Sequence, residues 1–215
     1  MDRILGSSGD DTIGLKKFNA VTGVEIIDGG AGFNRIEGRY YSDTLDFSAT
    51  TLVNIAEIDG GKNNDTIIGS EGDDVIIGGA GNDYLSGGKG SDNYVIRNGE
   101  GTDIISDNGV VGETDRISFM DASVTDLWFA RDSSDLLIYS LGQGNILRVD
   151  EWYNEVGSVV EEIHAEGQVL YQDQLESLVT AMATFGTPSG GEITLMESER
   201  QEVNNAIAAS WQTTA

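Results

Sequence analysis

The chain has 215 residues, with 37 Asp and Glu against 12 Lys and Arg, so its formal charge is −25 at pH 7. Such a charge opposes a compact state by self-repulsion, and it disfavours anionic partners such as nucleic acid or an anionic membrane surface. We therefore expect divalent cations as partners, and no nucleic acid. Because 39% of the residues are hydrophobic and strand periodicity is clear, we do not expect a disordered acidic chain.

The sequence has no cysteine and one histidine, His164. Disulfides and thiolate metal sites are therefore excluded, and a zinc site or a Ser-His nucleophilic centre would depend on a single residue. Nowhere do about 18 apolar residues run together, and no apolar segment follows Met1. We expect neither a transmembrane segment nor an N-terminal export signal.

A long duplication occupies the first part of the chain. Residues 6–14 (GSSGDDTIG) align with residues 38–46 (GRYYSDTLD), and residues 29–37 (GGAGFNRIE) align with the unit that begins at Gly60. A spacing one residue shorter leads from Gly38 to Gly69. We interpret the period from Gly6 to Gly38 to Gly69 as coils of one solenoid, with a looser connection in each coil.

Four nonapeptides then follow without a gap from Gly60: GGKNNDTII, GSEGDDVII, GGAGNDYLS and GGKGSDNYV. Each unit begins with glycine and has aspartate at its sixth place and an apolar residue at its eighth. A further turn, NGEGTD, extends from Asn98 to Asp103. The repeat region therefore covers about residues 6 to 105.

The repeated glycines and aspartates point to a metal site. Glycine takes positive φ at little steric cost, so the carbonyl oxygens of each turn can point toward one ion. A turn and a short strand make half a coil, so two nonapeptides complete one coil of a parallel solenoid and every second turn stacks. The stacked aspartates then lie about 4.8 Å apart, in the pairs Asp65–Asp83, Asp74–Asp92 and Asp83–Asp103. Carboxylates this close repel unless a cation lies between them, and Ca²⁺ fits because it accepts about six to eight oxygens with tolerant geometry.

The four units resemble the repeats-in-toxin (RTX) nonapeptide G-G-x-G-x-D-x-U-x, a calcium-binding β-helix repeat. The resemblance implies an all-β fold, a right-handed parallel β-roll (β-solenoid), in which carbonyls and Asp carboxylates of two turns on the same side hold each Ca²⁺. It nominates as calcium ligands the side chains of Asp65, Asp74, Asp83, Asp92 and Asp103, and the backbone at Gly61, Asn63, Ser70, Gly72, Gly78, Gly79, Ala80, Gly81, Gly87 and Lys89. Three turns depart from the pattern: Asn34 replaces Asp, Asn63 replaces the fourth-place Gly, and the bulky Arg39-Tyr40-Tyr41 fills the turn at Gly38. We expect weak or empty sites before residue 60.

After the repeats, alternating apolar residues predict more strands. Residues 126–141 are expected to form a hairpin that turns at residues 132–134, and residues 145–153 and 159–171 are expected to add further strands. We expect these strands to cover the end of the last coil, which would otherwise leave its core and edges open.

Two helices are predicted next. The first is expected to start at a capping box of Asp173 with Glu176 and to bury Leu175, Leu178, Val179 and Met182. The second is expected to start at Thr194 with Glu197, and to carry Met196, Val203, Ile207 and Trp211 along one face. The fold expected is thus a β-roll with a β-rich C-terminal cap and one or two short helices.

Residues 126–185, with LWFAR, DEWY, EEIHA and LVTAMATF, resemble the domain that follows the last repeats in haemolysin-type calcium-binding proteins, which include toxins and large adhesins. In that family the region caps the β-roll, and the extreme C-terminus is an uncleaved signal for type I secretion. The implied division is a calcium-binding RTX β-roll at 1–105, a capping domain at 106–189, and a C-terminal helix with the secretion signal at 190–215. A helix that only packs on the cap is the alternative for the last segment.

Two functions follow as hypotheses. The first is a secreted module, extracellular or at the cell surface, that folds on calcium binding after export by the type I secretion machinery and supports an upstream toxin, enzyme or adhesin. The alternative is an adhesin module that binds a host or cell-surface glycan; Trp128, Trp152 and Tyr153 could stack on a sugar, and exposure of two of them on one face would favour it. We do not expect an enzyme, because the Asp pairs lie in metal-binding turns without a nucleophile or an orienting base.

Overall fold

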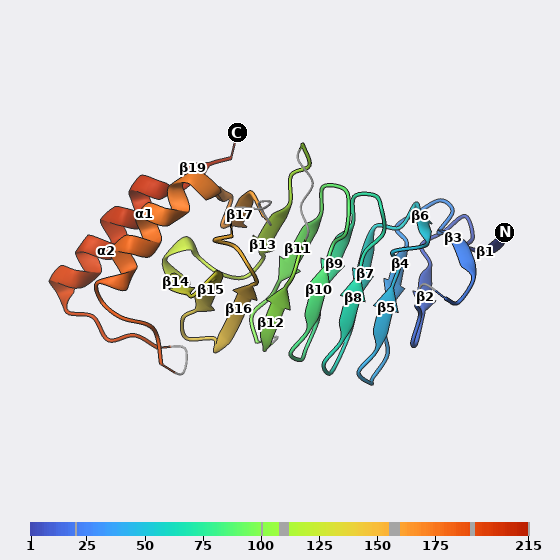
Figure 1. Ribbon diagram of the computed structural model, residues 1–215, viewed down its shortest axis with the longest axis horizontal. Coiled ribbons are helices and arrows are strands. Elements are labelled where there is room, and N and C mark those ends of the chain that lie inside the picture. Colours follow the sequence, from blue (N-terminus) through green and yellow to red (C-terminus); the bar gives the residue numbers. More distant parts are fainter. Residues whose placement is uncertain (20, 100, 108–111, 155–159, 190–191, 215) are drawn as a thin grey trace.

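A computed structural model describes residues 1–19, 21–99, 101–107, 112–154, 160–189 and 192–214. It is an elongated stack of short strands, with the N-terminus at one end and two helices at the other (Figure 1). The strands form three sheets. The expected all-β architecture with a parallel β-roll is confirmed.

The largest sheet contains, in spatial order, β19 (Gln212–Thr213), β18 (Gln168–Tyr171), β17 (Glu162–Ala165), β13 (Arg116–Phe119), β11 (Asn93–Ile96), β9 (Val75–Ile77), β7 (Glu57–Asp59), β4 (Arg35–Glu37) and β2 (Thr12–Gly14). The second contains β14 (Leu127–Asp132), β15 (Asp135–Ser140), β16 (Asn145–Val149), β12 (Thr102–Ile105), β10 (Tyr84–Ser86), β8 (Thr66–Ile68) and β5 (Thr44–Asp46). The third contains β1 (Asp2–Leu5), β3 (Val24–Asp28) and β6 (Thr51–Val53).

Within the four nonapeptides, the coil is as short as the repeat predicts. Ile58 pairs with Ile76 and Ile76 pairs with Tyr94, so successive strands of this sheet are separated by the length of two nonapeptides. On the opposite sheet Ile67 pairs with Leu85 in parallel, at the same separation. Two nonapeptides therefore complete one coil, and each contributes one short strand to one of the two sheets.

Upstream, the expectation that the period from Gly6 to Gly38 to Gly69 is one coil is wrong. Ile13 pairs with Ile36 and Ile36 with Ile58, so each coil here is longer than two nonapeptides but shorter than that period. The coils that contain β3 and β6 have an extra strand on a third side, which explains why they exceed two nonapeptides. The aligned segments 6–14 and 38–46 supply β2 and β5, which belong to opposite sheets. The two segments share a Gly/Asp turn pattern that occurs on both sides of the roll. Their strands do not stack on each other.

The core of the roll is a column of apolar side chains. The eighth-place residue of each nonapeptide is buried: Ile67, Ile76, Leu85 and Tyr94. Because successive side chains of a strand point to opposite faces, this single inward position per unit is sufficient to line the interior. The column continues in both directions through Ile36 and Ile117.

The strands after the repeats extend both main sheets of the roll. β16 pairs in parallel with β12, and β17 pairs in parallel with β13. The predicted hairpin is confirmed as β14 and β15, with Asp132 opposite Asp135 and a positive φ at Ser133. The short 3-10 helix η1 (Val124–Asp126) precedes it. The cap is therefore hydrogen-bonded to the last coil, in addition to the expected packing against it.

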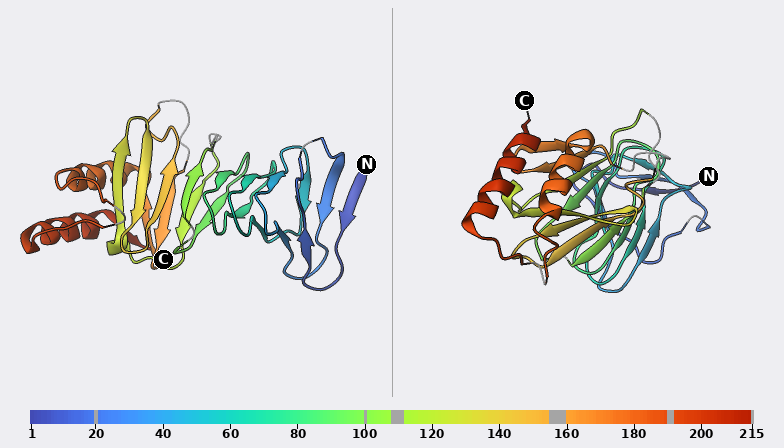
Figure 2. Two further views of the ribbon diagram at one scale, coloured as in Figure 1. Left: turned by 90° about the horizontal axis from the view of Figure 1, so that it is seen from below. Right: turned by 60° about the vertical axis from the view of Figure 1, so that its left-hand side comes forward.

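Two helices cover the far end of the cap, α1 (Gln172–Ala183) and α2 (Glu197–Ser210) (Figure 2). The predicted inward residues of α1 are buried, as are Val203, Ile207 and Trp211. Both predicted starts are wrong. Tyr171, the last residue of β18, is the N-cap of α1, because the chain passes directly from strand to helix. Met196 is the N-cap of α2, and its backbone N–H donates to Glu199 at 2.7 Å.

Met196 itself is exposed, unlike the other residues that we expected along the inner face of the second helix. Within the described residues, neither helix has the length and apolar character needed to cross a membrane.

Candidate metal centre

The sixth-place aspartates form two ladders, one on each side of the roll. In the first ladder the backbone N–H groups of Asp43, Asp65 and Asp83 each donate to the carboxylate of the aspartate one coil later, at 2.7 to 2.9 Å. Its members are Asp43, Asp65, Asp83 and Asp103. The second ladder follows the same rule at 2.7 to 2.8 Å, and its members are Asp74, Asp92 and Asp115. The three stacked pairs predicted from the sequence are all present.

The second ladder continues into the cap. Asp115 N–H donates to Glu161 Oε2 at 2.8 Å, so a glutamate takes the place of the next aspartate just before β17. Every aspartate of the two ladders is buried. Each of these aspartates lies directly before a strand or, for Asp103, inside one, and the pairing of that strand fixes the position of the carboxylate within the turn.

Several of these carboxylates have an oxygen that no protein group satisfies. Among the described residues, Asp43 Oδ1, Asp65 Oδ2, Asp83 Oδ2 and Asp92 Oδ2 are buried without a hydrogen-bond partner. Burial of a charged oxygen without a partner is strongly unfavourable, whereas Ca²⁺ prefers such hard oxygen ligands. The donor set in the turns therefore fits Ca²⁺.

The first glycine of each nonapeptide makes room for its own aspartate. A Cβ at Gly78 would lie 2.6 Å from Asp83 Oδ2, and one at Gly87 would lie 2.0 Å from Asp92 Oδ2. No side chain fits at these separations, so the carboxylate can fold back over the glycine only because Cβ is missing. Each turn thus wraps around its own free carboxylate oxygen.

Carbonyl oxygens of one turn lie close to the glycines of the next turn on the same side. The carbonyl oxygen of Gly61 would be 2.3 Å from a Cβ at Gly79, and that of Asn63 would be 2.2 Å from a Cβ at Gly81. On the other side, the carbonyl oxygen of Ser70 would be 2.6 Å from a Cβ at Gly88. The carbonyl oxygens of these nominated positions therefore lie between stacked turns. Gly61 O also accepts a hydrogen bond from Ala80 N–H at 2.9 Å.

The remaining nominated positions lie in the same turns. Gly72 O would be 2.7 Å from a Cβ at Gly90, so this carbonyl also lies against the next turn on its side. The side chain of Lys89 makes an exposed ion pair with Glu71, with Nζ 2.6 Å from Oε1, so only its backbone can serve the turn.

Burial dominates the electrostatics of the ladders. It raises the pKa of Asp65 from 3.8 to about 7, that of Asp83 to about 6 and that of Asp92 to about 8. Hydrogen bonds from backbone N–H groups oppose this rise, and neighbouring carboxylates add to it. The charged forms are thus unfavourable in these turns without a compensating cation.

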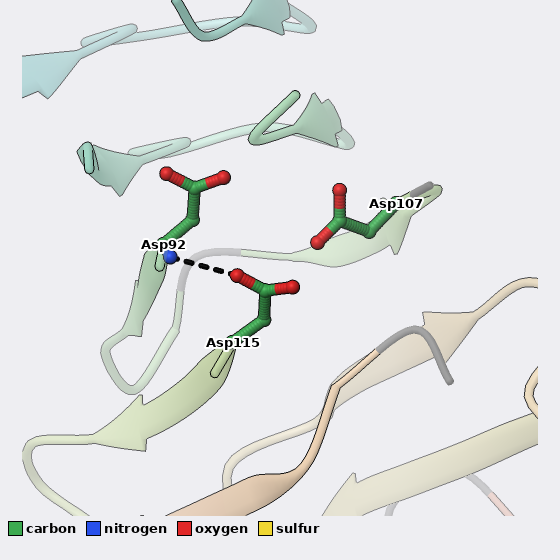
Figure 3. A group of neighbouring side chains, drawn as sticks. All are labelled: Asp92, Asp107 and Asp115. Carbon is green, nitrogen blue, oxygen red and sulfur yellow. Dashed lines mark hydrogen bonds between the residues drawn. The ribbon is translucent and has the colours of Figure 1, made fainter. Parts of the chain in front are cut away.

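A group of three carboxylates joins the fourth nonapeptide to the residues that follow it (Figure 3). Asp92, Asp107 and Asp115 are buried, and each has one oxygen within 4.8 Å of those of the other two. We did not predict Asp43, Asp107 or Asp115 as ligands. A shorter signature, aspartate followed two residues later by a buried aliphatic residue, finds Asp43 before Leu45 and Asp115 before Ile117, as it finds Asp65 before Ile67. No such signal identifies Asp107.

The upstream part of the second side lacks paired carboxylates. Asp11 N–H donates to Asn34 Oδ1 at 3.0 Å, and the next level is Ala56, before β7. The expectation of weak or empty sites before residue 60 therefore has a structural basis on this side. Asp43, in contrast, belongs to the first ladder despite the bulky turn before it.

The aromatic residues considered for sugar stacking are mostly inside the cap. Trp128 and Trp152 are buried, and the ring of Tyr153 lies under the Arg131 guanidinium at 4.0 Å. The two tryptophans therefore do not offer exposed faces to a glycan.

One comparison with known families bears on these turns. The model of the RTX calcium-binding nonapeptide repeat matches the chain in four copies, over residues 1–13, 20–47 and 59–94. This part of the chain is an RTX-type calcium-binding repeat region, and Ca²⁺ is the metal of such repeats. The match ends before Asp103, Asp107 and Asp115.

Proposed function

We propose that this calcium-binding module drives the folding of a secreted protein. Without calcium the chain is expanded, and at extracellular calcium concentrations the turns bind Ca²⁺ and the roll and cap become ordered. The observation that carries the proposal is the set of buried ladder oxygens without a hydrogen-bond partner among the described residues. Folding must bury these charges, so ion binding and folding form one equilibrium.

The proposal assigns three parts to the chain: the β-roll at 1–105, the cap at 106–189 and the C-terminal segment at 190–215. In the folded chain, Val203 and Ile207 of α2 and Trp211 at its C-cap are buried in the same core as the cap. A type I secretion signal in this helix would be accessible only while the chain is unfolded, before it meets calcium. Export would then precede folding, and the folded module would support an upstream toxin, enzyme or adhesin.

The glycan-binding alternative has less support, because Trp128 and Trp152 are buried. The proposal gives the chain no catalytic role. Its location is extracellular or at the cell surface, where calcium is abundant enough to fill sites of the affinity typical of extracellular modules, about 10⁻⁴ to 10⁻³ M.

Small-angle X-ray scattering of the full chain tests the proposal. In excess chelator we expect a radius of gyration that approaches the value for an unfolded chain of this length, about 50 Å. In calcium at about 5 mM we expect a value only slightly above the roughly 17 Å of a compact domain of this length, because the folded particle is elongated. A compact particle of the same dimensions in chelator would refute calcium-driven folding.

A further inference from the structure

The turn between β12 and β13 is not a nonapeptide, yet it brings acidic side chains to the last nonapeptide turn. Asp92 precedes β11, Asp107 follows β12, and Asp115 precedes β13. One oxygen of each lies within 4.8 Å of the others. Oxygens at such separations can all bind one Ca²⁺, because bonds of about 2.3 to 2.6 Å place opposite ligands about 5 Å apart.

The sheet register explains how Asp107 enters this group. Leu85 pairs with Ile105, so two residues further on Asp107 is level with Gly87, the first glycine of the fourth nonapeptide. An aspartate therefore occupies the place that glycine holds in the turn before it. Its carboxylate adds to the one that the ladder already supplies at Asp115.

A second observation points to a ligand. Asp92 is 0% exposed, and its Oδ2 has no hydrogen-bond partner among the described residues. Its Oδ1 accepts from Asp74 N–H at 2.8 Å, and its own N–H donates to Asp115 Oδ1 at 2.7 Å. Figure 3 shows Asp92 and Asp115 directly before the adjacent strands β11 and β13, with Asp107 beside them on the segment that follows β12.

The two ladder members of this group, Asp92 and Asp115, have no neutralising side chain in the part of the chain that the structure describes. Among the described residues, neither Asp92 nor Asp115 forms an ion pair with a Lys, Arg or His. Glu113 adds a further acidic side chain two residues before Asp115, and its Oε2 is also buried without a hydrogen-bond partner in the described part of the chain. Such a concentration of negative charge is unfavourable unless a cation is present.

We propose that Asp92, Asp107 and Asp115 hold a further Ca²⁺ at the junction between the last nonapeptide and the cap. The inference rests on the proposed calcium-binding function, and it adds a site in which Asp92 of the last matched repeat is joined by two ligands from beyond the match, Asp107 and Asp115. Asp115 lies just before β13, which pairs with β17, and its N–H donates to Glu161 of the cap. An ion here therefore fixes the first strand of the cap assembly against the last coil of the roll.

The test compares D107N with D121N in the full chain. Both substitutions remove one negative charge with little change of shape, but Asp121 is exposed and lies after β13. Isothermal titration calorimetry with CaCl₂ gives the number of bound ions, and circular dichroism at saturating calcium verifies the fold. We expect D107N to bind one ion fewer than the unsubstituted chain, and D121N to bind the same number.

Equal stoichiometry and affinity in folded D107N would overturn the junction site, while calcium binding by the unsubstituted chain would leave the proposed function intact. If D107N does not fold, Glu113→Gln decides, because this side chain is only partly buried. One site weakened several-fold in E113Q supports the proposal, and an unchanged titration overturns it. An unsubstituted chain that binds no calcium would instead refute the proposed function itself.

Discussion

At the scale of single residues, the choice between aspartate and asparagine decides whether a turn needs a cation. Asn34 occupies a ladder position, and its amide donates to the carbonyl oxygens of Gly30, Gly32 and Asn54 at 3.1 to 3.4 Å. It thus satisfies the surrounding carbonyls by itself. The side chain of Asp83, at the equivalent place of a later turn, has no N–H to donate, and its Oδ2 has no hydrogen-bond partner among the described residues, so an ion must do what the amide does.

Asp83→Ala should weaken calcium binding far more than Asp11→Ala. Asp83 is buried between two neighbours, donating its N–H to Asp103 and accepting from Asp65 N–H, so it can serve ions on both sides. Asp11 is only partly buried, and its stacked neighbour is Asn34. We expect a loss of apparent affinity of about tenfold or more for Asp83→Ala, about 1.4 kcal/mol. Calcium titration by calorimetry measures it. Equal losses for the two variants would show that the working sites are elsewhere.

Acid should partly replace calcium. Burial raises the pKa of Asp65 from 3.8 to about 7 and that of Asp92 to about 8, so the folded chain holds more protons than the unfolded chain between about pH 4 and 8. Stability without calcium is therefore greatest below pH 4 for these groups and falls as the pH rises through their folded-state values. In chelator, the β signal in circular dichroism should be larger at pH 5 than at pH 8. A signal that increases with pH in chelator would contradict the assigned burial.

At the scale of elements, the spacing of the stacked turns excludes side chains at the first glycine. A Cβ at Gly69 would lie 2.1 Å from Gly87 O of the next coil, whereas one at Gly72 would meet only Ser70 Oγ at 3.8 Å. The two glycines belong to one turn, and neither has a positive φ. Alanine substitutions at these two glycines therefore measure the effect of close coil stacking without a contribution from a left-handed backbone.

Gly69→Ala should thus destabilise the calcium-loaded fold by roughly 1 to 3 kcal/mol, as overpacking does. Gly72→Ala should change it by less than about 0.5 kcal/mol. Urea unfolding of both variants at saturating calcium measures the difference. Similar losses in the two would mean that the turns are not stacked as closely as in this structure.

Elements that a short sequence pattern determines were predicted correctly from the sequence. The nonapeptide fixes turn, strand and inward residue within nine places, so the inward side chains of Ile67 and Leu85 and the coil of two nonapeptides followed directly. The upstream coils could not be predicted in the same way, because β3 and β6 carry no turn signature and the alignment joined turns from opposite sheets. Asp107 enters its group only through the register of β10 with β12, which is a property of the folded sheet.

Helix starts were mispredicted for a similar reason. Asp173 and Glu176 have the spacing of a capping box, but β18 runs directly into α1 at Tyr171. The tertiary position of the strand therefore overrides the local capping signal. The inward face, which depends on apolar spacing along the helix, was predicted correctly at Leu175 and Met182.

At the scale of the whole molecule, the cap completes the two sheets of the roll. β12 and β13 pair with β16 and β17, so a chain without the cap would expose the edges of its last coil. The cap also contains large buried side chains such as Trp128 and Phe129, which can form a core without stacked carboxylates. It offers a template on which the first calcium-bound turn can form.

A chain of residues 1–105 should therefore stay disordered in calcium at about 1 mM, although it keeps the four nonapeptides. Residues 1–185 should regain calcium-driven order, because they restore β16, β17 and α1. Circular dichroism of both chains during a calcium titration provides the comparison. If the shorter chain folds at the same calcium concentration as the full chain, the cap is not needed as a template.

The central claim is that calcium binding and folding are one event, and far-UV circular dichroism of the full chain tests it most directly. The spectrum is recorded in excess chelator, then in calcium at about 5 mM, and then in magnesium at the same concentration. We predict a coil spectrum in chelator, a β spectrum in calcium, and little recovery in magnesium, because Mg²⁺ requires a stricter octahedron of ligands than these turns supply. A β spectrum that persists in chelator, or one that magnesium restores in full, would contradict the claim.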